Sequence, residues 1–236
     1  MKIISVLCPS RDRPRMALDF YQSVMRTANY KRNIEVLFYL DDDDPSLERY
    51  RELFDVYENC ALVIGEALPL STHWNVLLER SRGDIIIMSN DDVVYLTHGW
   101  DEILLEKVVG YEDELYCAWF DDGRAEVRKK NKEERNFCSF PIVSRRWCEV
   151  VGYLTPGLFH RIYNDNWISD LAEKISRQKY VPSVMTRHYH KRDDETAKRA
   201  RADGQNAKDE TTYTSDLAKQ MKKASIQCLR EALRPL

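Results

Sequence analysis

The stretch GDIIIMSNDD, residues 83–92, is the part of the sequence that decides the fold. Its four consecutive apolar residues, 85–88, follow Gly83 and predict a central strand of a parallel sheet, buried on both faces. Ligands of such sheets bind outside the carboxyl ends of the strands, which is where Asp91 and Asp92 fall. Carboxylates at this place suit Mg²⁺ or Mn²⁺ bound together with substrate phosphates, and an exposed acidic turn is the alternative without a ligand.

A second acidic cluster lies at the end of another predicted strand. Residues 34–40 are mostly apolar and run directly into Asp41–Asp44. Segments 3–8 and 61–64 predict two more strands, and between the strands residues 17–28, 47–57 and 72–80 place apolar side chains on one helical face. Strand and helix therefore alternate through residue 92, which predicts βαβ units and a parallel sheet.

The pattern changes after residue 92. Residues 121–136 form a charged loop without periodicity, which makes them a lid candidate, and residues 191–212 are polar enough to be flexible in part. The remaining segments predict helices at 99–109, 145–151, 166–177 and 215–233, a strand at 115–120 and an extended segment at 137–143. The helix at 166–177 is expected to bury Trp167.

The composition is that of an ordinary globular protein. With 236 residues, 43% of them apolar, the chain is long enough for one large domain with a sizeable core. The N-terminus lacks the apolar core of a signal peptide and no long apolar stretch follows, so we expect a soluble, cytoplasmic protein, in the host cytoplasm if a phage encodes it. The six scattered cysteines lack the spacing of a zinc site or a disulfide framework.

Several enzyme classes lack their motifs in this chain. None of its eight glycines forms a dinucleotide-binding G-x-G-x-x-G or a P-loop, and no G-x-S-x-G elbow offers a serine nucleophile. What remains is a sheet whose strand ends carry carboxylates. This arrangement favours metal-assisted chemistry on a nucleotide.

Four segments follow one another in an informative order. A polar loop, Pro9–Arg13, follows the first strand, Asp41 and Asp42 follow the second, Asn75 lies on a helix after Trp74, and residues 82–92 join Gly-Asp to an apolar strand and its acids. This order resembles the GT-A fold glycosyltransferases, in particular the small soluble type of family 2. The resemblance implies an α/β fold, a single Rossmann-like domain with a mostly parallel central sheet flanked by helices and a C-terminal helical extension.

The resemblance also implies a domain organisation. Residues 1–190 would form the glycosyltransferase domain, with the nucleotide-sugar half in 1–92 and the acceptor half in 93–190. Residues 191–236 would add a polar segment and a C-terminal helix that packs on the same domain.

Roles for individual residues follow from the same resemblance. Asp165, the acid before a predicted helix, is the expected catalytic base, and Asp92, His188 and His190 are expected to hold Mn²⁺ or Mg²⁺. Asn90 takes the first acidic position of the family's D-x-D motif, so Asp92 is expected to carry the metal. The residues expected to bind the donor are Pro9, Ser10, Arg11, Arg13, Asp41, Asp42, Asn75, Asn90 and Asp91. The residues expected on the acceptor side are Arg145, Tyr163, Asn164 and Trp167.

Simpler interpretations of these residues stay open at this point. Asp165 is also a suitable N-cap for the helix that starts at Asn166, and Asp41 and Asp42 are suitable at the start of a helix. His188 and His190 flank Tyr189, so on a strand both would point to one face, as metal ligands or as a polar face.

The implied reaction is metal-dependent transfer of a sugar from a nucleotide diphosphate sugar, expected to be a UDP-sugar, to a hydroxyl group. One base without a second nucleophilic acid favours inversion. The acceptor is a soluble glycan or another hydroxyl compound, or a hydroxymethylated base of phage DNA, since basic runs at 124–135 and 187–201 could face an anionic polymer. The alternatives from other classes are a sugar-phosphate nucleotidyltransferase and a non-catalytic nucleotide-sugar binding module.

Overall fold

The structure, a computed structural model, describes residues 2–124, 137–189 and 204–233. Within these ranges, a mixed sheet of eight strands forms the centre of the molecule, in the order β3-β2-β1-β4-β7-β6-β8-β5. Strands β7 and β5 run antiparallel to their neighbours, and all other pairings are parallel. The bounds of the strands are β1 Ile4–Pro9, β2 Ile34–Asp41, β3 Cys60–Gly65, β4 Ile85–Met88, β5 Val93–Tyr95, β6 Cys117–Asp121, β7 Ile142–Ser144 and β8 Gln178–His188.

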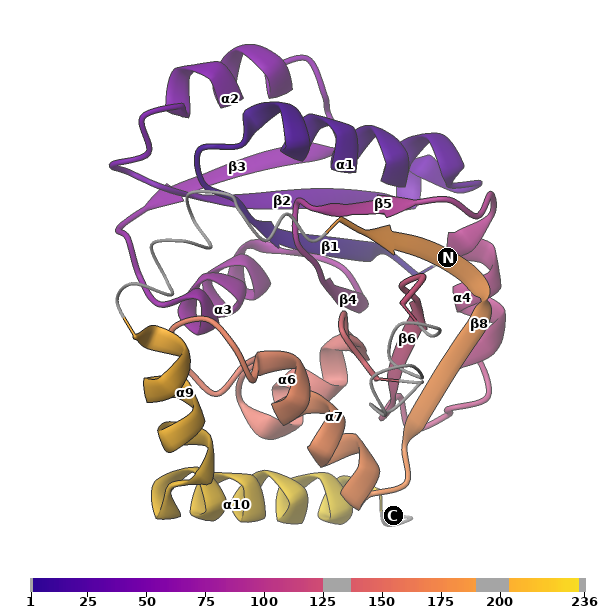
Figure 1. Ribbon diagram of the computed structural model, residues 1–236. Helices are drawn as coiled ribbons and strands as arrows, with labels where there is room; N and C mark the ends of the chain where they lie inside the picture. Colours follow the sequence, from indigo (N-terminus) through magenta and orange to yellow (C-terminus); the bar gives the residue numbers. More distant parts are fainter. Residues whose placement is uncertain (1, 125–136, 190–203, 234–236) are drawn as a thin grey trace.

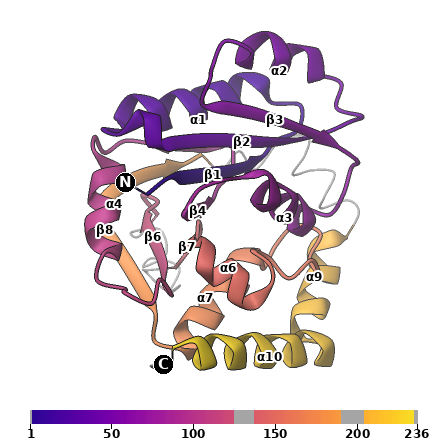
Figure 2. The ribbon, with the colours of Figure 1, turned by 180° about the vertical axis from the view of Figure 1, so that it is seen from behind.

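Helices cover both faces of the sheet, as Figures 1 and 2 show from opposite sides. The helices α1, α2 and α4 contribute to the core on one face, and α3, α6, α7 and α10 contribute to the core on the other. No helix in the described ranges combines the length and the apolar character that a membrane span requires. The bounds are α1 Pro14–Thr27, the 3₁₀ helix η1 Lys31–Asn33, α2 Leu47–Phe54, α3 Leu70–Arg80, α4 Trp100–Val108, α6 Arg145–Val151, α7 Asn164–Lys174, α9 Gln205–Thr214 and α10 Asp216–Ala232.

The strand β4 shows how the apolar run builds both cores at once. Its four residues are all buried, with Ile85 and Ile87 on the side of α1 and Ile86 and Met88 on the side of α3. Successive side chains of a strand point to opposite faces, so a central strand needs apolar residues at every position. The uninterrupted run 85–88 is therefore the signature of a strand covered on both sides.

The sequence predicted most of these elements. The strands expected at 3–8, 34–40, 61–64, 85–88 and 115–120 are confirmed within about two residues, and so is the mostly parallel character of the sheet. The elements beyond those expected include the strands Val93–Tyr95 and Gln178–His188. They also include the helix Gln205–Thr214, which was expected to belong to a polar and partly flexible segment. Of the lid candidate, residues 125–136 lie outside the described residues.

The end of the chain packs on the second core. Ala218 and Leu229 of α10 are fully buried there, and Arg230 of α10 donates a hydrogen bond to the carbonyl of Lys174 at the end of α7. Figure 1 shows α10 running along the lower side of the molecule, beneath α6 and α7. The C-terminal helices are thus part of the same packing unit as α7.

Candidate active site

The carboxyl ends of β1, β2 and β4 meet at one edge of the sheet because the three strands are parallel neighbours. The chain leaves each strand through a polar loop. The backbone N–H of Ser10 still donates to the carbonyl of Tyr39 (3.0 Å), and that of Ser89 donates to the carbonyl of Leu7 (2.9 Å), which holds these loops to the sheet. The loops carry most of the residues that the sequence assigned to donor binding.

Asp91 is the buried member of the acidic pair. Its side chain has no exposed surface, Ser10 donates its hydroxyl to one carboxylate oxygen (2.5 Å), and the guanidinium of Arg13 lies 3.0 Å from the other. Tyr50 lies 2.7 Å from the same Ser10 hydroxyl. A carboxylate enclosed in this way fastens the loop after β1 to the loop after β4. Ser10, Arg13 and Asp91, all expected at the donor, are therefore engaged with one another.

Asp92 meets His188 across the pairing of β5 with β8. Val93 pairs with His188 in the antiparallel register, and the N–H of Tyr189 donates to the carbonyl of Asp92 (2.8 Å). In this register the imidazole Nε2 of His188 lies 3.2 Å from a carboxylate oxygen of Asp92. The ring of Phe140 packs edge-on against the imidazole at 5.0 Å and restricts its orientation.

The Asp92 and His188 side chains offer a carboxylate oxygen and an imidazole nitrogen, which are donor types that Mn²⁺ accepts. The described residues contain no group of three His, Cys, Asp or Glu side chains that could hold a metal ion, and His190 lies outside them. Mg²⁺ and its analogues commonly take one or two protein ligands and complete their shell with waters and substrate phosphates. Asp92 and His188 therefore fit a cation that is bound partly by the protein and partly by water and substrate phosphates, rather than one bound by protein ligands alone.

Asp41 ends β2 and forms a second polar centre at the same edge. Arg11 donates from its guanidinium to one carboxylate oxygen of Asp41 (2.6 Å) and also to Asp43. Burial raises the pKa of Asp41, although the hydrogen bond from Arg11 opposes the rise. The neighbouring Asp42 has an exposed side chain and does not join this centre.

His73 of α3 faces the other oxygen of Asp41 without donating to it. Its Nε2 lies 3.3 Å from that oxygen but accepts a hydrogen bond from the backbone N–H of Leu68 (3.2 Å). Burial, with the charge of Arg11, lowers the pKa of His73 to about 4, so the imidazole is neutral. Because Nε2 accepts from Leu68, the single ring proton is assigned to Nδ1. Its ring stacks on Tyr39 at 4.1 Å. The Oδ1 of Asp41 is thus a buried acceptor with no hydrogen-bond donor in the described part of the chain.

Asn75 has its amide committed to the backbone. Its oxygen accepts from the N–H groups of Leu154 (2.9 Å) and Thr155 (3.0 Å), and its nitrogen donates to the carbonyl of Thr155 (2.8 Å). The side chain therefore ties the loop after α6 to α3.

Asp165 lies in the first turn of α7. The helix starts at Asn164 with Tyr163 in the N-cap position, so Asp165 is not the N-cap that the sequence also allowed. One carboxylate oxygen of Asp165 accepts from the N–H of Asn166 (2.9 Å). Its charge also helps to raise the pKa of Tyr213 in α9, after burial and the hydrogen bond from Tyr213 to Asp170, which places Asp165 near the C-terminal helices.

The four residues expected on the acceptor side divide into two pairs. Tyr163 is half-buried and stacks on Tyr213 at 4.5 Å, and the buried Asn164 beside it keeps an amide oxygen without a donor among the described residues. These two lie beside Asp165.

The other two, Arg145 and Trp167, make contacts elsewhere in the fold. Arg145 donates to the carbonyls of Gly83 (2.7 Å) and Ser81 (3.0 Å), at the amino end of β4 and so at the opposite edge from Asp92. Trp167 is fully buried in the second core, as the helical pattern predicted, and its indole N–H donates to Tyr153.

Two acids at strand ends escaped the site prediction. Asp44 is buried and accepts from the N–H groups of Asp12 (2.9 Å) and Ser46 (2.8 Å), which joins the loops after β1 and β2. Asp122, just after β6, accepts from Ser139 (2.9 Å), and its carbonyl accepts from the N–H of His188 (3.4 Å). The available signal was the same as at residues 85–92, an apolar strand that runs into acids.

Known proteins share the architecture. Among solved structures, the mannosyltransferase PcManGT from Pyrobaculum calidifontis, in complex with GDP-Man and Mn²⁺, superposes with a TM-score of 0.65 at 12% identity, over 98% of this chain and 74% of that chain. Residues 1–349 of TarS from S. aureus, in complex with UDP-GlcNAc, superpose with a TM-score of 0.64 at 13% identity, over 98% of this chain and 71% of that chain. At such identities the likeness shows the fold alone, and the fold is GT-A.

The amino-acid sequence itself carries the family signal. No curated protein matches this chain. Residues 5–160, however, match the family model described as Glycosyl transferase family 2. The chain therefore belongs to glycosyl transferase family 2 and is a glycosyltransferase.

Proposed function

We propose that this glycosyltransferase moves a sugar from a nucleotide diphosphate sugar to a hydroxyl acceptor, with inversion at the anomeric carbon and with Mn²⁺ or Mg²⁺. The observation that carries the proposal is the meeting of Asp92 and His188 at the carboxyl edge of the sheet, 3.2 Å apart. The edge also carries Asp41, and binding outside the carboxyl ends of parallel strands is the general rule for α/β folds.

A divalent cation bound by Asp92 and His188 would neutralise charge on the leaving diphosphate. The enclosed Asp91 contributes indirectly: through Ser10 and Arg13 it keeps the loop before Asp92 in one place. Catalytic groups act best when their supporting contacts hold them rigidly. Asp91 and Asp92 would therefore serve the same step in different ways.

The buried Oδ1 of Asp41 supports recognition of a nucleobase. It needs a hydrogen-bond donor, and the Arg11 guanidinium is already on the other oxygen of the carboxylate. The ring N–H of uracil or guanine is a donor of this kind. PcManGT is described with GDP-Man and TarS with UDP-GlcNAc, so we propose a UDP-sugar as the donor and a GDP-sugar as its first competitor.

Asp165 is the proposed general base. It would take the proton of the attacking hydroxyl as that oxygen bonds to the anomeric carbon and the bond from this carbon to the diphosphate breaks. This single displacement inverts the configuration at the anomeric carbon. General bases contribute about 10²- to 10⁴-fold, and Asp165→Asn should remove most of this from kcat while leaving donor binding intact. A retained anomeric configuration in the product would contradict the single displacement.

A donor panel tests the proposal. UDP- and GDP-sugars are incubated with Mn²⁺ and scored for a rise in melting temperature and for release of nucleoside diphosphate. Release of UDP or GDP supports glycosyl transfer. Release of pyrophosphate would favour the nucleotidyltransferase alternative, and a melting shift without any release would favour a binding module. No response to any donor would overturn the proposal.

The acceptor can be tested through ionic strength. We propose a glycan or another hydroxyl compound, with hydroxymethylated DNA as the second candidate. The basic runs that suggested DNA lie largely in residues 125–136 and 190–203, outside the described ranges. Binding to DNA falls steeply with salt as counterions are released. A steep loss of acceptor affinity between 50 and 200 mM salt, the range over which about 10³-fold losses are typical of DNA-binding proteins, would favour DNA.

A further inference from the structure

The buried carboxylate of Asp209 in α9 holds the loop that leads into α7. Its side chain is almost fully buried (1% exposed). Its two oxygens accept from three successive backbone N–H groups, those of His160 (2.9 Å), Arg161 (2.8 Å) and Ile162 (2.9 Å). Three donors on one charged acceptor form a strong, directional anchor. The anchor comes from a helix 47 residues beyond the loop and beyond the segment that matches the family model.

The same loop is attached to the donor side through its carbonyls. The carbonyl of His160 accepts from the N–H of Leu70 (2.9 Å), and that of Phe159 accepts from the N–H of Ser71 (3.3 Å). Both donors lie in the first turn of α3, the helix that places His73 beside Asp41. Residues 159–162 therefore connect α3 and α9: their carbonyls accept from α3, and their N–H groups donate to Asp209 of α9.

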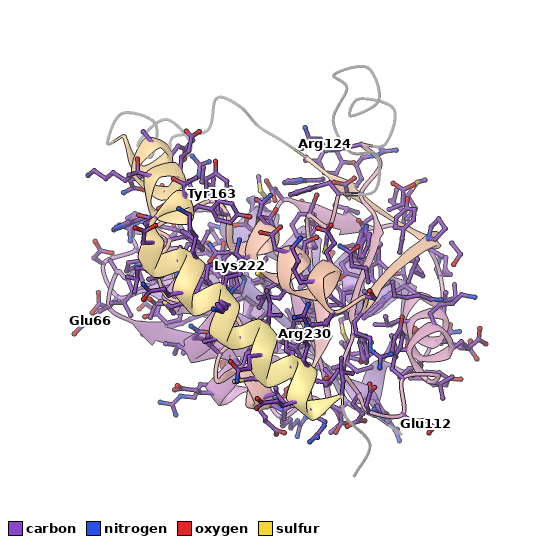
Figure 3. The ribbon with its side chains drawn as sticks, turned by 90° about the horizontal axis from the view of Figure 1, so that it is seen from below. Glu66, Glu112, Arg124, Tyr163, Lys222 and Arg230 are labelled. Carbon is purple, nitrogen blue, oxygen red and sulfur yellow. The ribbon has the colours of Figure 1, made fainter. Side chains whose placement is uncertain are left out.

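The residue after this bridge has an unusual backbone. Tyr163 has φ of 72°, in the left-handed region, where a side chain other than glycine is strained and persists only when its surroundings enforce it. The bonds to Asp209 fix the residues just before it, and the stack on Tyr213 of α9 fixes its ring. In Figure 3, Tyr163 lies beside α9. The first turn of α7, with Asp165, begins at the next residue.

We propose that Asp209 is a positioning residue for the transfer reaction, which sets Asp165 relative to the donor site through residues 160–163. The inference rests on the proposed role of Asp165 as the base. A carboxylate is required because three N–H groups converge on it; an asparagine would offer one oxygen and turn an NH₂ group toward backbone donors. Displacement of a catalytic group by about 1 Å can cost about 10²-fold in rate. The C-terminal helices thus belong to the acceptor side of the active site.

The test compares Asp209→Asn with Asp216→Asn, the same change at an exposed, ion-paired position in the first turn of α10. Nucleoside diphosphate release is measured with Mn²⁺ and the donor from the panel that gives the highest turnover, with water as acceptor. We expect Asp209→Asn to lower kcat by about 10- to 100-fold with the donor KM changed by less than about threefold. The Asp216→Asn variant should match the parent chain.

A double variant separates positioning from general destabilisation. If Asp209 acts through Asp165, then Asp209→Asn should cause no further loss in kcat once Asp165→Asn is present. The inference would be overturned if the fold-losses in kcat of the two single variants multiplied in the double variant, or if the kcat of Asp209→Asn equalled that of Asp216→Asn. Either result would leave the role of Asp165 intact. A full kcat in Asp165→Asn alone would instead overturn the proposed base, and the inference with it.

Folding is checked by melting temperature and circular dichroism in each variant. If Asp209→Asn does not fold, Asp209→Glu replaces it, since it keeps the charge and moves the carboxylate by one methylene group. The same split, a reduced kcat with a donor KM close to that of the parent chain, is expected from Asp209→Glu. An unchanged kcat in Asp209→Glu, or a donor KM that rises as much as kcat falls, would contradict the inference.

Discussion

Asp91 and Asp92 are neighbours in the chain with opposite environments. The carboxylate of Asp91 is enclosed by Ser10 and Arg13, whereas that of Asp92 faces His188 on the far side of the β5–β8 pairing. The chain turns at these two residues between β4 and β5, and the two carboxylates meet different neighbours. Asp91 therefore supports the loop, and Asp92 is the acid that we propose as the metal ligand.

Removal of Asp92 tests this division at the level of one side chain. We expect Asp92→Ala to lower the affinity for Mn²⁺ by more than about 10-fold. Even the loss of a residue that only supports a metal ligand lowers metal affinity by about 10- to 100-fold. The measurement is the Mn²⁺-dependent rise in melting temperature in the presence of UDP. Asn90→Ala, at the half-buried first position of the motif, is the matched control and should keep most of the rise. Equal losses in both variants would contradict the assignment.

His73 makes the stability of the chain depend on pH. Its folded pKa of about 4 lies below its ordinary value of 6.5, so the folded state holds this proton less tightly than the unfolded state does. The contribution of the neutral imidazole to the free energy of unfolding is complete above pH 6.5. It is lost as the pH falls toward 4, by up to about 3 kcal/mol. The raised pKa of Asp41 acts in the opposite direction near the acid end of this range.

Denaturant unfolding between pH 4 and 7 measures this effect. His73→Gln keeps a side-chain oxygen that can accept from Leu68 and cannot titrate, so its free energy of unfolding should vary less with pH than that of the parent chain. The exposed His98→Gln is the control and should retain the parent slope. A parent profile that is flat in this range would contradict the buried neutral imidazole.

At the scale of elements, Gly83 decides how closely β4 approaches β1. A Cβ atom on Gly83 would lie 2.6 Å from the backbone nitrogen of Ser5 and closer still to its hydroxyl, which accepts the Gly83 N–H. The strand that leads to Asp91 and Asp92 thus depends on the absence of a side chain just before its first residue. This is the physical role of the glycine in the Gly-Asp pair that precedes the apolar run.

Gly83→Ala should lower the free energy of unfolding by about 1–3 kcal/mol, the usual range for an added methyl group in a packed site. Gly110→Ala is the matched control, because a Cβ there meets no atom within 4 Å and the backbone has no positive φ. The control should be neutral or slightly stabilising, since alanine restricts the unfolded chain. Equal unfolding free energies in the two variants would contradict the close approach of β4 and β1.

The elements that the sequence predicted are those with a strong local pattern. The run 85–88 and the apolar stripe 17–28 depend only on the period of the backbone, so a window of neighbours reveals them. The strand β5 escaped prediction because it has three residues and owes its existence to pairing with β8. The helix α9 escaped because its outer faces are polar and the side chain it buries is Asp209.

At the scale of the whole molecule, α10 completes the second core although it is distant in sequence from the sheet. Leu229 is fully buried in that core, whereas Leu217 of the same helix is 58% exposed. We expect Leu229→Ala to lower the free energy of unfolding by about 2–5 kcal/mol through lost burial and the cavity it leaves. Leu217→Ala should change it by no more than about 0.5 kcal/mol. Denaturant unfolding of both variants checks this, and similar losses in both would contradict the packing of α10.

The sequence by itself determined the α/β class, the parallel strands, the acids at their carboxyl ends and the family, because local patterns and their order along the chain carry this information. Only the tertiary structure decided which acids meet which partners: Asp92 with His188, Asp91 with Arg13, and Asp209 with residues 160–162. It also placed Arg145 at the opposite edge. Such contacts join residues tens of positions apart, and the path of the chain between strands, rather than any local period, brings them together.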